Sequence, residues 1–194
     1  MSSQREISIP SLEILKSEKK RLSRRKAFFK TLRNTVGPLI VVAAIAVLIA
    51  TLIFPVLRVM GSSMAPTLDN DQIIICRKTG NFKKGDIIAF YYNNKILLKR
   101  VIATTGEKVD IAKDGTVIVD GEEIDEPYIK NKAYGKTNIK LPYQVPDEMV
   151  FVMGDNRDVS IDSRNTAVGC VSQEAILGKA VIRVWPFKII KNGQ

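Results

Sequence analysis

The sequence contains no histidine, and it contains only two cysteines, Cys76 and Cys170. The absence of histidine removes the commonest general base of enzymes and the commonest metal ligand. Two cysteines are too few and too distant for a zinc site, and they could form at most one disulfide. Because their flanks are apolar, we expect free buried thiols, with a single disulfide as the alternative. We therefore expect no metal and no cofactor.

Charged residues are missing from Asn34 to Leu57, a run of 24 positions. About 20 apolar residues suffice to span the hydrocarbon of a bilayer. A cleaved signal peptide would have a shorter apolar core and a small-residue cleavage site. A buried soluble helix rarely stays apolar on every face over such a length. The run therefore predicts one transmembrane helix over residues 34–58.

The net charge of +10 is concentrated at one end of the chain. Residues 1–33 hold ten Lys or Arg against three Asp or Glu, which leaves a net charge of only +3 for the rest. This distribution argues against a nucleic-acid partner and favours a solvated basic tail, partly helical, that is attracted to membrane lipid. By the positive-inside rule we expect residues 1–33 in the cytoplasm and residues 59–194 outside.

Residues 59–194 have the sequence pattern of a β domain. Short β-rich runs alternate with turns at residues 72–78, 86–92, 95–103, 108–112, 116–121, 148–155 and 180–187. Gly115 predicts a hairpin turn, residues 125–147 read as an irregular loop, and only residues 172–178 invite a short helix. We expect a mostly β fold behind a single N-terminal membrane helix, with the β domain on the extracytoplasmic side.

Ser63 lies in a turn-prone stretch, Gly61 to Leu68, just after the apolar run. Without histidine, a serine nucleophile needs another base, and lysine can serve if its pKa is lowered. At pH 7 an unperturbed lysine is neutral in about one molecule in 2,500. On a strand, Lys99 shares its face with Leu97 and Val101, and apolar surroundings of this kind lower a lysine pKa. The alternative is a surface lysine, whose aliphatic chain lies along the sheet while its charged amine stays in water.

A polar loop, Gly154 to Arg164, follows a hydrophobic run. It reads either as a solvent-exposed turn of paired charges or as a preorganised hydrogen-bond cluster. In the second interpretation Asp162 and Arg164 form a pair, and Ser160 fixes a nearby amine.

Four sequence boxes together resemble the bacterial type I signal peptidases, membrane-anchored serine–lysine endopeptidases that cleave signal peptides from exported preproteins. The matching boxes are Ser63–Leu68 (S-M-x-P-T-L), Lys84–Ile87, Lys99–Ile102 (K-R-V-I) and Gly154–Arg164 (G-D-N-x-x-x-S-x-D-S-R). The resemblance runs from about residue 30 to 187. A single anchor and a short 125–147 excursion are similar to the compact Gram-positive-like branch.

The resemblance implies that Ser63 attacks the scissile carbonyl and Lys99 is the general base. It implies that Ser160 orients the Lys99 amine and that Asp162 and Arg164 hold the supporting loop. The oxyanion would rest on the Ser63 N–H and a second donor. In part of the family that donor is a hydroxyl at the position of Gly61, which has no side chain here, so the donor must come from backbone or elsewhere.

Preproteins with small residues at positions −1 and −3 are the implied substrates, met close to the export translocon and bound as an added strand. Met64 and Pro66 are candidates for substrate contact, and Met64 could equally contact lipid or pack internally. A non-catalytic membrane-anchored adaptor with a β binding domain is the alternative function. A self-cleaving repressor would carry a DNA-binding helix-turn-helix where residues 34–57 are apolar instead.

Overall fold

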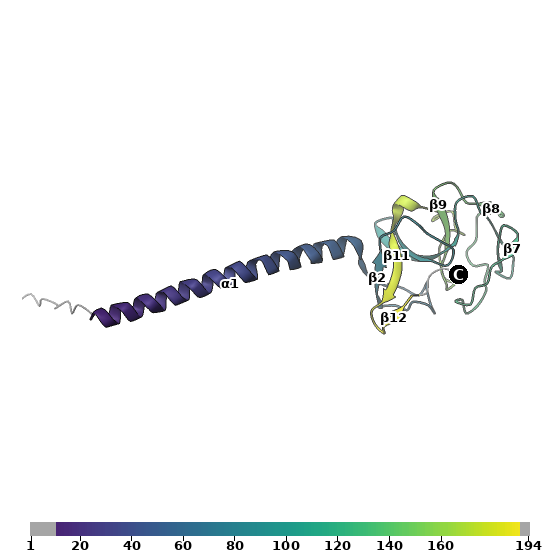
Figure 1. The fold of residues 1–194 in the computed structure, drawn as a ribbon. Helices are drawn as coiled ribbons and strands as arrows, with labels where there is room; N and C mark the ends of the chain where they lie inside the picture. The colour runs from purple at the N-terminus through teal and green to yellow at the C-terminus, as the bar shows by residue number, and fades with distance from the viewer. Residues whose placement is uncertain (1–10, 191–194) are drawn as a thin grey trace, which may run out of the picture. The chain divides into compact units, whose positions relative to one another are not determined.

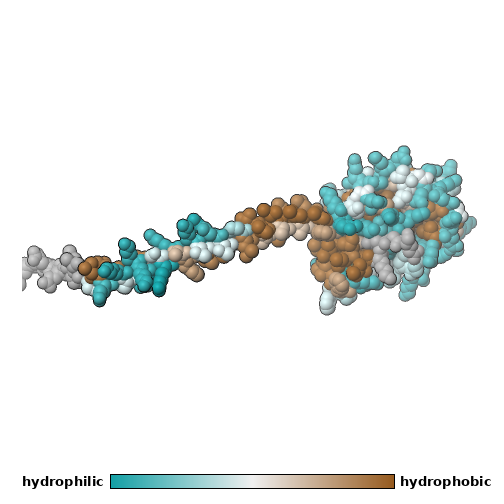
Figure 2. Space-filling view, viewed as in Figure 1, coloured by the Kyte–Doolittle hydropathy of each residue, from teal (hydrophilic) through white to brown (hydrophobic). Residues whose placement is uncertain are grey.

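The computed structural model describes residues 11–190 of the chain. The chain divides into two units between Ala50 and Thr51. The first unit is dominated by one helix, α1 (Leu12–Ile53), of 42 residues. By length and composition, α1 is able to cross a membrane. Figure 2 shows hydrophilic residues over the first half of α1 and hydrophobic ones over the second.

The helix ends at Ile53, five residues before the end that the apolar run predicts. Pro55 explains this difference, because proline has no N–H for a helix and disfavours helical backbone in the residue before it. Residues Val56–Arg58, which the sequence assigned to the membrane helix, instead form strand β1 and pair with a later strand of the β unit.

The β unit consists of short strands with almost no helix, as the sequence predicted. Its remaining elements are β2 (Ile73–Arg77), β3 (Ile87–Tyr92), β4 (Lys95–Ala103), β5 (Lys108–Ile111), β6 (Val117–Val119), β7 (Glu122–Glu123), β8 (Tyr143–Gln144), β9 (Met149–Met153), β10 (Val171–Ser172), the 3-10 helix η1 (Gln173–Ala175), β11 (Ile176–Arg183) and β12 (Lys188–Ile189).

The strands form two antiparallel sheets. The larger has the order β1-β2-β11-β3-β4-β9-β10, with β12 paired to β11, and the smaller has the order β7-β6-β5-β8. Figure 1 labels β2, β9, β11 and β12 of the larger sheet and β7 and β8 of the smaller one. In the larger sheet β4 lies between β3 and β9, with Lys99 opposite Ile88 and Arg100 opposite Met153. Lys99 has its strand partner in β3, and its neighbour Arg100 has partners in both β3 and β9, so the sheet fixes the backbone of this segment.

The predicted helix at residues 172–178 is wrong over its second half. Only Gln173–Ala175 form a helical turn, and Ile176 already begins β11. Ile176, Gly178 and Ala180 are buried in alternation, which is the two-residue period of a strand. Gly178 also lies so close to a neighbouring strand that an added Cβ would be 2.8 Å from the Arg77 carbonyl oxygen. Strand packing therefore overrides local helix propensity here.

The irregular stretch at 125–147 is confirmed, with β8 as its only strand. It packs closely against the β5–β6 hairpin, whose predicted turn contains Gly115 at φ +90°. A Cβ on Gly115 would lie 2.3 Å from the Ala133 nitrogen, so glycine is required for both the turn and the contact.

Candidate active site

Ser63 lies in a compact turn between β1 and β2. Gly61 enters this turn at φ +89°, a conformation that favours glycine. Its N–H donates to the Asn70 side chain at 2.7 Å, and the Leu68 N–H donates to the Met64 carbonyl at 2.9 Å. These bonds leave Ser63 itself partly exposed at the surface of the turn.

Lys99, 36 positions away in sequence, meets Ser63 directly. The Lys99 Nζ lies 3.0 Å from the Ser63 Oγ and donates to the Leu98 carbonyl, also at 3.0 Å. Lys99 is only 3% exposed, so its amine is not in water, and the alternative of a surface lysine is wrong. The pair has the distance that proton transfer between a hydroxyl and a base requires.

Burial lowers the pKa of Lys99, because the charged amine loses its hydration. The carboxylates of Asp162 and Asp155 oppose this by raising the pKa, while the Arg164 guanidinium lowers it. Desolvation is the largest of these effects and decides the direction. The neutral amine that a general base needs is thereby favoured.

The 154–164 loop is a buried hydrogen-bond cluster rather than a solvated turn. Asp162 and Arg164 form an ion pair of 2.9 Å, with side chains 0% and 1% exposed. Asp162 also accepts the Gly154 N–H at 2.9 Å, and the Ser163 Oγ accepts the Val152 N–H at 2.9 Å. The loop is therefore tied to the end of β9.

Ser160 lies beside this cluster without the contact that was expected of it. Its Oγ is buried and has no hydrogen-bond partner within residues 11–190. The Lys99 amine is instead held by Ser63 and the Leu98 carbonyl. The Ser160 Oγ is nevertheless close to the site, because an added Cβ on Gly154 would meet both it and the Ser63 carbonyl oxygen.

Gly154 therefore has a predictable substitution effect. The Cβ of alanine would lie 2.3 Å from the Ser160 Oγ and 2.5 Å from the Ser63 carbonyl oxygen. We expect Gly154→Ala to displace Ser63 and to lower kcat about a hundredfold, as small misplacements of reacting groups do. Gly80→Ala, where nothing lies within 4 Å, is the matched control and should keep wild-type kcat. Equal activity of the two variants in a cleavage assay would contradict the close contact.

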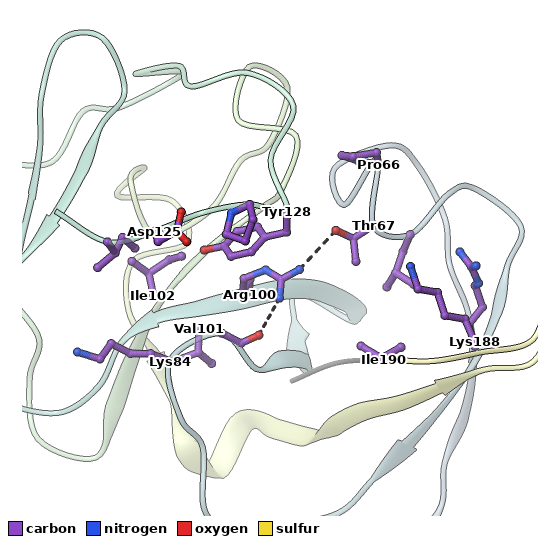
Figure 3. A pocket seen from close by; sticks show the side chains of 15 residues that line it. Pro66, Thr67, Lys84, Arg100, Val101, Ile102, Asp125, Tyr128, Lys188 and Ile190 are labelled. Carbon is purple, nitrogen blue, oxygen red and sulfur yellow. Dashed lines mark hydrogen bonds between the residues drawn. The ribbon is translucent and has the colours of Figure 1, made fainter. Parts of the chain in front are cut away.

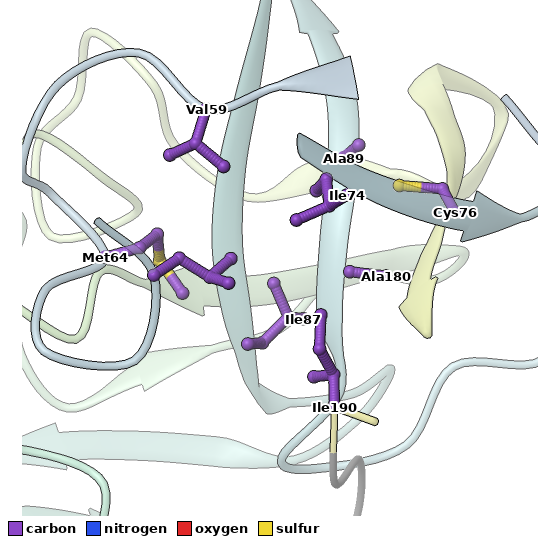
Figure 4. Close-up of a cluster of buried hydrophobic side chains, with 9 residues drawn as sticks. Val59, Met64, Ile74, Cys76, Ile87, Ala89, Ala180 and Ile190 are labelled. Carbon is purple, nitrogen blue, oxygen red and sulfur yellow. The ribbon is translucent and has the colours of Figure 1, made fainter. Parts of the chain in front are cut away.

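Two other residues that the sequence suggested, Gly61 and Met64, are not positioned for the oxyanion and substrate contacts expected of them. The Gly61 N–H is occupied by Asn70, so in this conformation it does not point at an oxyanion. Met64 is 1% exposed and packs with Val59, Ile74 and Ile87 in a core cluster (Figure 4), so it is a core residue, not a surface contact for substrate or lipid.

Pro66 lies at a separate cavity of about 640 Å³ (Figure 3). This cavity is formed by the 66–68 turn, β4, the 124–128 segment and the β11–β12 hairpin, and neither Ser63 nor Lys99 lines it. Arg100 is one of its lining residues and contacts both Thr67 and Tyr128 (Figure 3). Pro66 is therefore only three positions from Ser63 in sequence but lines a cavity that Ser63 does not line.

Sequence reasoning missed a set of buried charges around Ser63 and Lys99. Arg100, 4% exposed, forms a bidentate pair with Asp155 at 2.9 and 2.6 Å, and Arg157 pairs with Glu126. Arg100 follows Lys99 in one sequence box, and Asp155 follows Gly154 in another. These two opposite charges could have suggested an ion pair between the boxes. Glu126 had no such indication. Both cysteines are free, as expected, with Cys76 buried and Cys170 partly so.

Comparison with known proteins gives consistent matches. Residues 32–185 match the family described as "Signal peptidase, peptidase S26". The chain is 32% identical over 189 residues to the signal peptidase I of Bacillus amyloliquefaciens, covering 92% of this chain and 99% of that protein. It is 39% identical over 154 residues to the signal peptidase IB of Staphylococcus aureus, covering 69% and 79%. A crystal structure of a signal peptidase I from Enterococcus faecalis V583 aligns at 32% identity and a TM-score of 0.43, covering 54% of this chain and 97% of that one.

Proposed function

The chain belongs to the signal peptidase family S26, serine endopeptidases that remove signal peptides, and from this premise we propose that it works through a Ser63–Lys99 dyad and an acyl-enzyme. The observation that carries the proposal is the 3.0 Å contact between the Ser63 Oγ and the buried Lys99 Nζ. Family membership favours this enzyme over the non-catalytic adaptor.

In the proposed reaction, neutral Lys99 takes the hydroxyl proton as the Ser63 Oγ attacks the scissile carbonyl. Lys99 then gives that proton to the leaving amine of the mature protein, which leaves the signal peptide as an ester on Ser63. Lys99 next removes a proton from water, which attacks the ester, and returns it to the Ser63 oxygen. The same amine thus serves in both halves of the reaction.

The tetrahedral intermediate needs donors for its negative oxygen. The Ser63 N–H has no hydrogen-bond partner within residues 11–190, so it is available for this role. Because the Gly61 N–H donates to Asn70, it becomes a second donor only if this turn rearranges when substrate binds.

The proposed substrate is a preprotein whose signal peptide has small residues at −1 and −3. Its cleavage region would bind in extended form along an edge of the β unit, with main-chain hydrogen bonds as in other added strands. Strand β1 is such an edge in the larger sheet, and it leads directly into the Ser63 turn.

A membrane location follows from the same proposal. The apolar part of α1 would anchor the enzyme, with the basic residues 1–33 on the cytoplasmic side and residues 59–194 on the outer side of the cell membrane. Support comes from the composition and length of α1. A substrate tethered in the bilayer near the translocon would then meet an enzyme anchored in the same membrane.

The pH dependence of cleavage tests the proposed base. Since only the neutral Lys99 amine accepts a proton, kcat/KM should rise with pH as Lys99 loses its charge. Burial lowers the pKa of Lys99, so the midpoint should lie below about 10.4, the value of an ordinary lysine. The measurement uses the detergent-solubilised full chain and a preprotein with an Ala-x-Ala site. A profile that is flat with pH would exclude a titrating base.

A further inference from the structure

Three consecutive residues, Gly154, Asp155 and Asn156, connect the two members of the dyad. The Asn156 N–H donates to the Ser63 carbonyl at 3.1 Å, and its side chain donates to the Ser62 carbonyl at 3.2 Å. The Asp155 carboxylate acts on Lys99 by raising its pKa. A displacement of residues 154–156 would therefore shift the turn that holds Ser63. It would also change the electrostatic field at the Lys99 amine.

Two buried arginines hold residues 154–156. The Arg157 Nε donates to the Gly154 carbonyl at 3.1 Å. Arg100 binds both oxygens of Asp155, at 2.9 and 2.6 Å, and anchors itself on the Gly85 carbonyl at 2.7 Å. A planar guanidinium fixes direction as well as distance through such paired bonds, so these arginines set where the segment lies.

Glu126 holds the first arginine. It accepts from both terminal nitrogens of Arg157, with the Nη1 to Oε2 distance at 2.9 Å. The two side chains are 0% and 2% exposed, so no water replaces this partner. Among residues 11–190, Glu126 is the only carboxylate that forms an ion pair with Arg157.

Glu126 also supports the second arginine, through Tyr128. The Tyr128 hydroxyl donates to Glu126 at 2.9 Å, which fixes the tyrosine ring. The Arg100 Cζ lies over that ring, 3.8 Å from its centroid. Figure 3 shows the two side chains beside each other. Cation–π contact strengthens when water is excluded, and Arg100 is only 4% exposed. One carboxylate from the irregular 125–147 stretch therefore steadies both arginines.

We propose that Glu126 is a positioning residue for the Ser63–Lys99 pair, acting through Arg157 on Gly154 and through Tyr128 and Arg100 on Asp155. It touches neither the dyad nor the place of the scissile bond. This role rests on the proposed function, because it presupposes that Ser63 and Lys99 carry the reaction. This proposal assigns the irregular stretch 125–147 a role in catalysis, which no sequence pattern within that stretch indicates.

Glu126→Gln tests the role of Glu126 itself, because its carboxylate accepts from both Arg157 and Tyr128. The amide cannot satisfy both Arg157 nitrogens, so Gly154 and the Ser63 turn lose their fixed position. We expect kcat to fall about tenfold or more, with KM within about threefold, in the detergent-solubilised full chain at a temperature where circular dichroism shows it folded. Glu123→Gln is the matched control, because Glu123 is also acidic but pairs with Lys132 on the surface. It should keep wild-type kcat.

Tyr128→Leu tests the route through Tyr128 and Arg100 with the Glu126–Arg157 pair intact. The charged groups that act on Lys99 are Asp155 and Asp162, which raise its pKa, and Arg164, which lowers it. If Arg100 loses its aromatic support, it neutralises Asp155 less well, and the charged amine is stabilised. The midpoint of kcat/KM should then move to higher pH. Tyr128→Phe keeps the ring but removes its hydrogen bond to Glu126, so the midpoint should move in the same direction by a smaller amount. A purely structural role would leave the wild-type midpoint in both variants.

The outcomes separate this inference from the proposed function. If Lys99→Ala still cleaves the preprotein, the proposed dyad is wrong. If Lys99→Ala is inactive while Glu126→Gln keeps wild-type kcat and Tyr128→Leu keeps the wild-type midpoint, the dyad stands and the positioning role is overturned. If Glu126→Gln does not fold, the midpoint of Tyr128→Phe decides, because that variant removes only the hydrogen bond between Tyr128 and Glu126. A raised midpoint supports the positioning role, and a wild-type midpoint overturns it.

Discussion

Ser63→Ala and Lys99→Ala should each lower the rate of preprotein cleavage about a thousandfold or more, which corresponds to about 4 kcal/mol of lost transition-state stabilisation. The reason is the direct contact of their reacting atoms, 3.0 Å apart. Because the two groups act as one unit, the double variant should be no slower than either single variant. Cleavage is followed by the appearance of the mature protein from a purified preprotein.

Lys95→Ala is the control for this loss. Lys95 lies on the same strand, β4, but is exposed. Its variant should cleave at the wild-type rate. All three variants should unfold at similar temperatures to the wild type, since neither Ser63 nor Lys99 belongs to a buried ion pair among residues 11–190. Substantial activity in Ser63→Ala would show that another nucleophile operates.

Asp162→Asn should have the largest effect on stability. The substitution keeps a hydrogen-bond acceptor for the Gly154 N–H but leaves Arg164, with a side chain only 1% exposed, without its ion partner. Breaking a buried pair by removing one charge costs about 3–5 kcal/mol. In a protein of this size the melting temperature should fall by roughly 10 °C. Thermal unfolding of the solubilised chain, followed by circular dichroism, measures this change.

Asp71→Asn is the matched comparison. Asp71 pairs with Arg58, but the two side chains are 59% and 68% exposed. An exposed pair contributes about 1 kcal/mol or less. A comparable loss of stability in the two variants would mean that burial does not distinguish these ion pairs.

The sequence was sufficient to predict those structural elements that are determined by neighbouring residues. Strand β4 was predicted to its ends from its composition, and strand alternation placed apolar neighbours around Lys99. The hairpin at Gly115 also follows from one residue with a positive φ. The absence of histidine left lysine as an available base, but the choice of Ser63 and Lys99 as nucleophile and base rested on the resemblance to the signal peptidases.

The sequence was insufficient where contacts between distant segments decide. The start of β11 at Ile176 depends on pairing with β3, although its residues favour a helical turn. The burial of Met64 depends on the sheet beneath the serine turn. Glu126 and Arg157 are 31 positions apart, and Glu126 lies in a stretch without periodicity, so no pattern indicates their pairing.

The titration of Lys99 by NMR is the most direct test of the central claim. Lysines labelled with ¹³C at Cε give resonances that move as each amine loses its proton, and Lys99→Arg identifies the one from Lys99 by its loss. We predict that Lys99 titrates below about 10.4, the ordinary value of a lysine side chain, because burial lowers its pKa. A Lys99 midpoint at or above that value would contradict its role as a neutral base for Ser63.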